Sequence, residues 1–330
     1  MLTVTLYVRE NCSLCEQACA DLEDLQAEIP HNLVLVDVEK EALTEFVDQI
    51  PVLEAGPYTI KAPFDVRKLR MTLGAANDRQ SQLEKVDLES HQKRIKRGRS
   101  FGFGDRLFYW LSRRYMIVFN LFAFFYVGLA FLAPVLMAGG KTTPANLIYG
   151  VYGRLCHQLA YRSWFLFGEQ PAYPREMADV DRWVSYEEAT GMDPYDVRSA
   201  FEFRGNEILG YKVAFCQRDI AIYSAMLGFG LLFSLTKRRL PPLPILAWVL
   251  LGMLPIGLDG ISQIISQLPW NIIPVRESTP LLRTITGALF GFSTAWFAYP
   301  VVEEVMAETR KVLAVKLQAS QLENGNDESS

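Results

Sequence analysis

Two cysteines near the N-terminus have the type and spacing needed for thiol chemistry. Cys12 and Cys15 follow a β-rich segment at residues 2–8 and open a stretch at 12–27 with apolar residues at helical spacing. The first turn of a helix offers unpaired N–H groups and the positive end of the helix dipole. Both stabilise a thiolate at Cys12, and Cys15, one turn later, is placed to resolve a mixed disulfide. The motif therefore predicts thiol–disulfide exchange.

Two other interpretations of this motif are a zinc half-site and a pair of inert thiols. Zinc is disfavoured because the first 76 residues contain no second Cys-x-x-Cys pair. Cys19 lies one turn after Cys15, and we expect it to pack as a small hydrophobic residue.

The elements around the motif predict a compact α/β domain. We expect strands at residues 2–8, 33–38, 51–53 and 58–60, helices at 12–27 and 41–47, and a last helix capped by Asp65 and running through Leu73. Residues 2–75 resemble the glutaredoxin-like family of the thioredoxin fold through Cys12, Cys15 and Pro51. The resemblance implies a cis Ile50–Pro51 bond bordering the thiol, and a cytosolic thiol protein or glutathione as partner. Ser13-Leu14 departs from the commoner Pro-Tyr pair.

The rest of the chain is apolar enough to enter a membrane. Half of the 330 residues are hydrophobic, and apolar runs occupy about 115–137, 213–235, 243–268 and 282–302. Each run reaches the roughly 20 residues that a spanning helix needs. The sequence therefore predicts an α/β thioredoxin-like N-terminal domain joined to an all-α integral membrane bundle of about four transmembrane helices.

Shifts in composition divide the chain into expected parts. These are a glutaredoxin-like domain at 1–76, a basic linker at 77–114, a transmembrane domain at 115–305 with an extracytoplasmic insertion at 169–210, and a polar C-terminal tail at 306–330. The segment at 145–167 is apolar but interrupted by glycine, arginine and histidine. We expect it to form an interfacial or re-entrant helix.

Basic residues set the expected orientation. They cluster in the linker, at 237–239 after the second apolar run and at 310–311 after the fourth. Lysine and arginine concentrate in cytoplasmic loops, so we expect a multi-pass protein of the cell membrane with both termini in the cytoplasm. Because the basic linker adjoins a span, we expect it to flank the lipid bilayer on the cytoplasmic side and not to bind nucleic acid.

A second set of reactive residues lies in or beside the expected spans. Cys156 and His157 belong to the segment at 145–167, and Cys216 and Asp219 open the second span. These four residues combine soft and hard metal ligands, so a zinc or iron site is one interpretation. A disulfide or dithiol pair of the two cysteines is a second.

A third interpretation is a structural ion-pair network that locks the bundle while the cysteines pack; its members would be Arg218, Asp219, Asp259, Glu277 and Arg283. Ionisable side chains within a membrane are costly and need partners. Asp259 and Gln263 are four residues apart and share a helical face, while Gly287 and Gly291 permit close helix contact. The expected intramembrane polar cluster consists of Arg218, Asp259, Gln263, Glu277 and Arg283.

The stretches around these residues resemble an uncharacterised family of predicted integral membrane proteins, domain of unknown function 2085. The resemblance covers about residues 148–302 and rests on the motifs at 156–158, 215–219, 258–263 and 277–287. The family has no established activity, so the resemblance implies a fold group and no particular reaction.

The motifs together predict a membrane-bound thiol–disulfide oxidoreductase that uses Cys12 and Cys15 on the cytoplasmic side. The alternative is a metal- or ion-binding integral membrane protein of unknown activity with a regulatory redox domain. In the expected topology Cys156 and Cys216 lie near the outer face, across a hydrocarbon core of roughly 30 Å. Thiol exchange needs contact between sulfurs, so we expect no direct relay from Cys12 to these cysteines.

Overall fold

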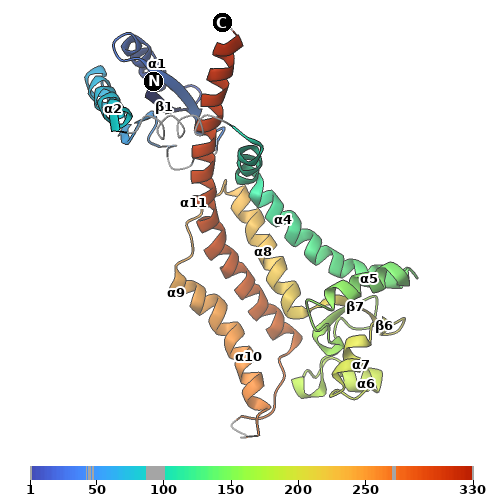
Figure 1. Cartoon of the computed structure of the whole chain (residues 1–330). Helices are drawn as coiled ribbons and strands as arrows, with labels where there is room; N and C mark the ends of the chain where they lie inside the picture. Colours follow the sequence, from blue (N-terminus) through green and yellow to red (C-terminus); the bar gives the residue numbers. More distant parts are fainter. Residues whose placement is uncertain are drawn as a thin grey trace. The chain divides into compact units, whose positions relative to one another are not determined.

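The structure is a computed structural model that describes residues 2–41, 43, 46, 48–86, 101–269 and 273–328. It divides into two compact units, one made of Met1–Tyr115 with Val302–Ser330 and one made of Met116–Val301. Two long helices, α4 (Phe103–Ala138) and α11 (Pro280–Glu328), contribute residues to both units (Figure 1).

The first unit contains a mixed four-stranded sheet with strand order β2-β1-β3-β4. Strand β1 pairs with β2 in parallel and with β3 antiparallel, and β3 and β4 form an antiparallel hairpin. This arrangement confirms the thioredoxin-like α/β fold. The helix expected at 41–47 lies largely outside the described residues. The elements are β1 (Leu2–Val8), α1 (Ser13–Gln26), β2 (His31–Asp37), β3 (Val52–Ala55), β4 (Tyr58–Lys61) and α2 (Val66–Val86).

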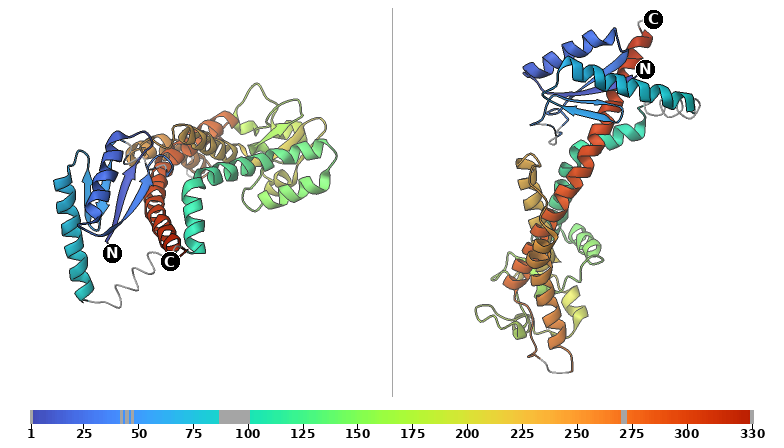
Figure 2. Two further views of the ribbon diagram at one scale, coloured as in Figure 1. Left: turned by 90° about the horizontal axis from the view of Figure 1, so that it is seen from above. Right: turned by 90° about the vertical axis from the view of Figure 1, so that its left-hand side faces the viewer.

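Helices α1 and α2 cover one face of this sheet (Figure 2), where Leu22 and Leu73 pack with Leu6 in a buried core. Helix α2 begins as expected, because the Asp65 carboxylate accepts the N–H of Lys68 at 2.8 Å. It runs beyond Leu73 because residues 74–86 include a single glycine and no proline to end it. The basic residues at 93–99 lie outside the described residues.

The opposite face of the sheet packs against the last part of α11. Ala314 is buried there among residues of β1 and β2. Arg310 is fully buried, where it pairs with Glu303 and donates to the carbonyl oxygens of Ser112 and Glu41 at 2.7 and 3.1 Å. Residues 306–328, expected as a polar tail, therefore form helix in the structure. Leu313 and Ala314 are buried on this helix, and the charged residues around them conceal that buried side in the sequence.

The second unit holds helices long and apolar enough to cross a membrane, and the described residues supply four candidate spans: Phe103–Ala138, Gln217–Leu235, Ile245–Ser266 and Pro280–Gln321. The third comprises α9 (Ile245–Trp248), a π-helical turn at Val249–Met253 and α10 (Leu254–Ser266). Helix α5 (Thr142–Tyr152) has 11 residues and rises about 16 Å. It is too short to cross a core of roughly 30 Å.

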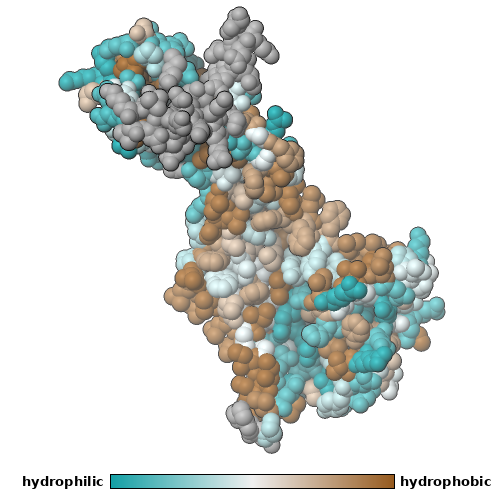
Figure 3. Space-filling view, in the orientation of Figure 1, coloured by the Kyte–Doolittle hydropathy of each residue, from teal (hydrophilic) through white to brown (hydrophobic). Residues whose placement is uncertain are grey.

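On the face seen in Figure 3, large apolar patches cover these helices. Only 11% of the third candidate span is buried within the protein, and Leu246, Leu258 and Ile264 are at least 60% exposed. Large apolar side chains are rarely left exposed in such numbers by soluble proteins. The bilayer is the solvent that fits this surface.

The insertion between α5 and α8 (Gln217–Leu235) folds around its own core of tyrosine and phenylalanine side chains. A three-stranded sheet of order β5-β7-β6 lies in it. Its elements are β5 (Ser163–Leu166), α6 (Tyr186–Thr190), α7 (Val197–Glu202), β6 (Gly205–Asn206) and β7 (Gly210–Cys216), with short 3-10 turns at Ala160–Arg162 and Glu176–Ala178.

Lys212 of β7 holds this insertion together from inside. It is fully buried, and its Nζ donates to the carbonyl oxygens of Gln158 at 2.7 Å, Phe201 at 2.6 Å and Ala200 at 3.5 Å. Burial lowers the pKa of Lys212 to about 7. The three carbonyl acceptors compensate part of the desolvation that this shift reflects.

Replacing Lys212 with methionine should lower the free energy of unfolding by about 1–3 kcal/mol, since buried acceptors lose their donor while the apolar stem is kept. Thermal unfolding of the full-length protein in detergent micelles measures the effect. Lys141→Met is the matched control because Lys141 is exposed. Equal stability of the two variants would contradict the assigned role of Lys212.

Candidate functional site

The Cys-x-x-Cys motif forms the N-terminus of α1. Cys12 is the N-cap residue, with extended backbone, and it is disulfide-bonded to Cys15. The N–H of Cys15 points at Cys12 Sγ at 3.2 Å. Cys12 is half-buried, whereas Cys15 is 3% exposed. The more accessible sulfur therefore lies at the helix end where a thiolate is stabilised.

A pocket of about 380 Å³ opens beside this disulfide and is lined by Cys12, Cys15 and Cys19 among others. Burial, followed by the nearby Glu23 and Glu16, raises the pKa of Cys19, which disfavours its thiolate. The Ile50–Pro51 bond is cis, as the resemblance implied. Pro51 is followed by Val52, which pairs with Tyr7 near the end of β1. The Cys-x-x-Cys motif follows this end of β1 in the chain. Pro51 itself does not line the pocket.

Two thiols and a carboxylate of the second unit converge at the start of α8. The sulfurs of Cys156 and Cys216 and a carboxylate oxygen of Asp219 all lie within 4.8 Å of one another. Cys216 is the N-cap residue of α8, and its Sγ accepts the N–H of Asp219 at 3.5 Å. Cys156 is held from the turn after α5, where its N–H donates to the Tyr152 carbonyl oxygen at 2.9 Å.

The two thiols share a hydrogen bond, which affects them in opposite directions. It lowers the pKa of Cys156, which accepts the bond, and raises the pKa of Cys216 well above its usual value. Burial also raises the pKa of Cys216. Asp219, which also hydrogen-bonds to the Cys156 thiol, opposes the lowering of the Cys156 pKa.

A cavity of about 330 Å³ adjoins this group. His157, which the sequence grouped with the three ligands, lines the cavity, but its ring nitrogens are outside the set of mutually close ligand atoms. Three arginines line the same cavity: Arg162, Arg218 and Arg283.

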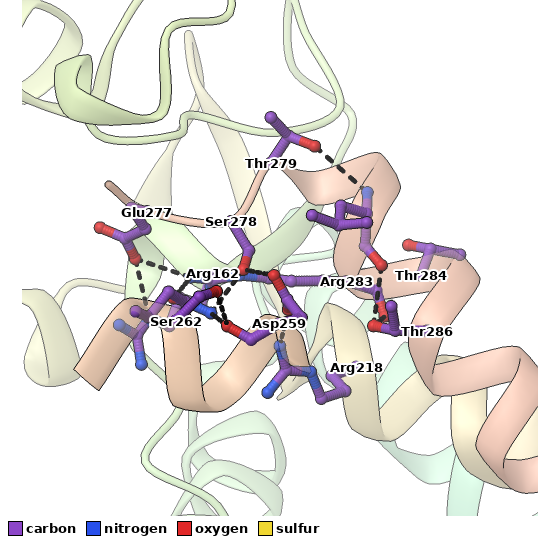
Figure 4. A network of polar contacts seen from close by, with 12 residues as sticks. Arg162, Arg218, Asp259, Ser262, Glu277, Ser278, Thr279, Arg283, Thr284 and Thr286 are labelled. Atoms are coloured by element: carbon purple, nitrogen blue, oxygen red, sulfur yellow. Dashed lines mark hydrogen bonds and ion pairs between the residues drawn. The ribbon is translucent and has the colours of Figure 1, made fainter. Parts of the chain in front are cut away.

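The polar cluster expected from the sequence forms one connected network with two carboxylates at its centres (Figure 4). Asp259 of α10, whose side chain is 2% exposed, pairs with Arg218 and with Arg276, the latter at 3.1 Å. It also accepts a hydrogen bond from Ser278. These contacts join α8, α10 and the segment that precedes α11.

Glu277 is the second centre, and its side chain is also 2% exposed. It pairs with Arg283 at 2.7 Å, Arg162 at 2.9 Å and Arg175 at 3.4 Å. Gln263 links the two centres, because its amide donates to Ser278 while its oxygen lies 3.5 Å from an Arg283 nitrogen. The network thus ties the insertion to the membrane helices.

Arg175 and Arg276 belong to this network but carried no clear signal in the sequence. Arg276 adjoins Glu277, which offered a weak hint. Arg175 lies in the polar insertion, where an arginine is expected to face water. Only the folding of the insertion against the membrane helices buries it, to 8% exposure.

Helices α8 and α11 approach each other closely, and this approach brings the cysteine–aspartate cluster next to the ion-pair network. A Cβ on Gly287 would lie 2.7 Å from the Arg218 carbonyl oxygen, and one on Gly291 would overlap the backbone of Ile222. The close approach places Arg283 of α11 and Arg218 of α8 on one cavity with Cys216. The glycine pair therefore has the contact role that its spacing predicted.

These features define a membrane protein that carries a thioredoxin-like domain. Residues 3–74 match the family model of the Glutaredoxin-like domain (DUF836), and residues 202–297 match that of the Predicted membrane protein (DUF2085). The second match includes Cys216, Asp259 and Glu277 and begins after Cys156. Both family resemblances noted from the motifs are thereby confirmed.

The chain is also similar to Uncharacterized protein MJ1492 of Methanocaldococcus jannaschii. The two are 24% identical over 202 residues, which is 59% of this chain and 97% of the relative.

Proposed function

We propose that the protein is a membrane-bound thiol–disulfide oxidoreductase whose redox centre is the Cys12–Cys15 pair. The observation that carries this proposal is the disulfide between a half-buried Cys12 at the N-terminus of α1 and a buried Cys15. The nucleophile in such exchange must be accessible and readily deprotonated, and a helix N-terminus favours its thiolate.

The chemistry runs through a mixed disulfide. In the reduced protein, the Cys12 thiolate attacks one sulfur of a partner disulfide and expels the other as a thiolate, which takes up a proton. Cys15 then loses its proton and attacks Cys12 Sγ, which forms the Cys12–Cys15 disulfide and releases the second partner thiol. Two electrons pass to the partner, which is the disulfide form of a cytosolic thiol protein or of glutathione, and a separate thiol reductant must then reduce the Cys12–Cys15 disulfide again.

The distribution of basic residues supports a cytoplasmic location for this reaction. Lysine and arginine occupy 237–239 directly after α8, and the linker before α4 is also basic. The positive-inside rule assigns both stretches, and with them the redox domain and both termini, to the cytoplasmic side of the cell membrane.

Trapping with a Cys15→Ser variant tests the proposal. Without Cys15 the mixed disulfide at Cys12 cannot be resolved, so we expect the full-length variant to accumulate an adduct with oxidised glutathione or a cytosolic protein. Non-reducing electrophoresis and mass spectrometry of the Cys12 peptide detect it. Cys19→Ala is the matched control and should leave the wild-type exchange rate unchanged.

Two results would remove this function. One is a Cys15→Ser protein that forms no adduct with any of these partners. The other is an adduct that persists after Cys12 is also replaced by serine.

A further inference from the structure

The cluster of two cysteines and one aspartate in the second unit has the composition of a metal site, and it is separate from the Cys12–Cys15 centre. We propose that Cys156, Cys216 and Asp219 bind a divalent metal ion of the zinc or iron class, with one coordination position open to the arginine-lined cavity. Two thiolates and a carboxylate are a donor set that such ions accept.

The distances suit one shared ion. Two sulfurs on a tetrahedral zinc ion lie about 3.8 Å apart when each Zn–S bond is about 2.3 Å. The three donor atoms already lie within 4.8 Å of one another, so adjustments of about 1 Å by side chains bring all three onto one ion. Binding releases the two thiol protons to solvent and involves no electron transfer.

Asp219 distinguishes a metal site from a simple dithiol. A disulfide would use the two sulfurs but gives no role to a carboxylate beside them. The arginines of the network pair with Asp259 and Glu277, and in the described part of the chain Asp219 takes part in none of the ion pairs. This carboxylate faces the thiols instead, and its side-chain hydrogen-bond partner is the Cys156 thiol.

The positive charges around Cys156, Cys216 and Asp219 favour the metal-bound form of the site. A divalent ion with two thiolates and one carboxylate has a net charge of −1, which suits a cavity bordered by Arg162, Arg218 and Arg283. Arginine side chains near bound thiolates act as the partners that tune a metal site.

The cavity leaves room for a fourth ligand. Its volume is about 330 Å³, against the roughly 30 Å³ that one water occupies in the liquid. Arg162, Arg218 and Arg283 border this cavity, and their positive charge suits a small oxyanion, such as a carboxylate or phosphate group, that completes the coordination. Three protein ligands plus an open position is the arrangement of reactive metal sites.

Cobalt(II) titration of the reduced full-length protein in detergent micelles tests the site. All proteins should carry Cys12→Ser and Cys15→Ser, which removes the other dithiol. We expect absorption from thiolate-to-cobalt charge transfer at one ion per chain. Cys216→Ser should lose most of it, with affinity reduced at least about tenfold, since even partners outside the ligand set affect affinity by 10–100-fold. Asp219→Cys should instead strengthen the absorption, a gain that a misfolded variant would not give.

His157→Ala and inorganic phosphate test the open position. We expect His157→Ala to bind cobalt as the parent does, and phosphate to change the cobalt d–d spectrum. The metal site is overturned if the parent shows no thiolate absorption, if Cys216→Ser retains it, or if Asp219→Cys leaves it unchanged. The open position is overturned if His157→Ala abolishes binding or phosphate has no effect.

Discussion

Replacing Glu277 with glutamine should reduce the free energy of unfolding by about 3–5 kcal/mol, the cost of leaving a buried charge without its partner. Glutamine has nearly the same shape, so the change removes charge and little packing. Arg283, whose side chain is 5% exposed, would lose its carboxylate, as would the less buried Arg162. Arg175, 8% exposed, would keep only the longer pair with Glu187 at 4.0 Å. Thermal or denaturant unfolding in detergent micelles measures the loss.

The matched control for this change is Glu202→Gln. Glu202 pairs with Arg198 at 2.9 Å, nearly the same distance, but both side chains are exposed, at 61% and 86%. Exposed ion pairs between residues four apart on a helix, such as this one, contribute about 0.3–0.5 kcal/mol to the free energy of unfolding. A Glu277→Gln variant that loses no more stability than Glu202→Gln would show that the network does not stabilise the fold.

A double-mutant cycle separates the Arg283–Glu277 pair from the rest of the network. Because the two side chains are 2.7 Å apart and nearly inaccessible, the double variant Glu277→Gln, Arg283→Gln should be more stable than the sum of the single losses predicts. Strict additivity would mean that the two charges do not interact.

Gly291→Ala should separate α8 from α11 and lower stability by about 1–3 kcal/mol, as overpacking does in a close-packed interior. The new methyl group would overlap the backbone of Ile222 on α8, and a backbone cannot rotate away as a side chain can. Close approach at small residues is a main source of helix association in a bilayer, where no hydrophobic effect drives helices together.

Gly228→Ala is the control for this change. Gly228 also lies in a membrane helix, α8, but a Cβ there would meet nothing within 4 Å. We expect this variant to be as stable as the wild type, or slightly more so because alanine favours helix. Equal unfolding temperatures for Gly291→Ala and Gly228→Ala would contradict the close helix contact.

The order of elements in the first unit could be predicted because its signals are local. Alternating apolar residues, the turn at Gly56 and the cap at Asp65 each act within a few residues. The four candidate spans were predictable for a similar reason, since a run of about 20 apolar residues records the bilayer thickness directly. The C-terminal helix was not, because Ala314 packs against the sheet at the other end of the chain and Arg310 bonds to Glu41, 269 residues earlier.

The sequence by itself determined which side chains must find partners: Cys12 and Cys15 through their spacing, and Asp259, Glu277 and Arg283 through the cost of charge in an apolar setting. The tertiary structure decided which partners they found. It placed Asp219 with two cysteines, left His157 at the edge of that group and brought Arg175 to Glu277. Spacing along one helix fixes which residues share a face, but contacts between segments depend on how helices pack, and no local pattern records that packing.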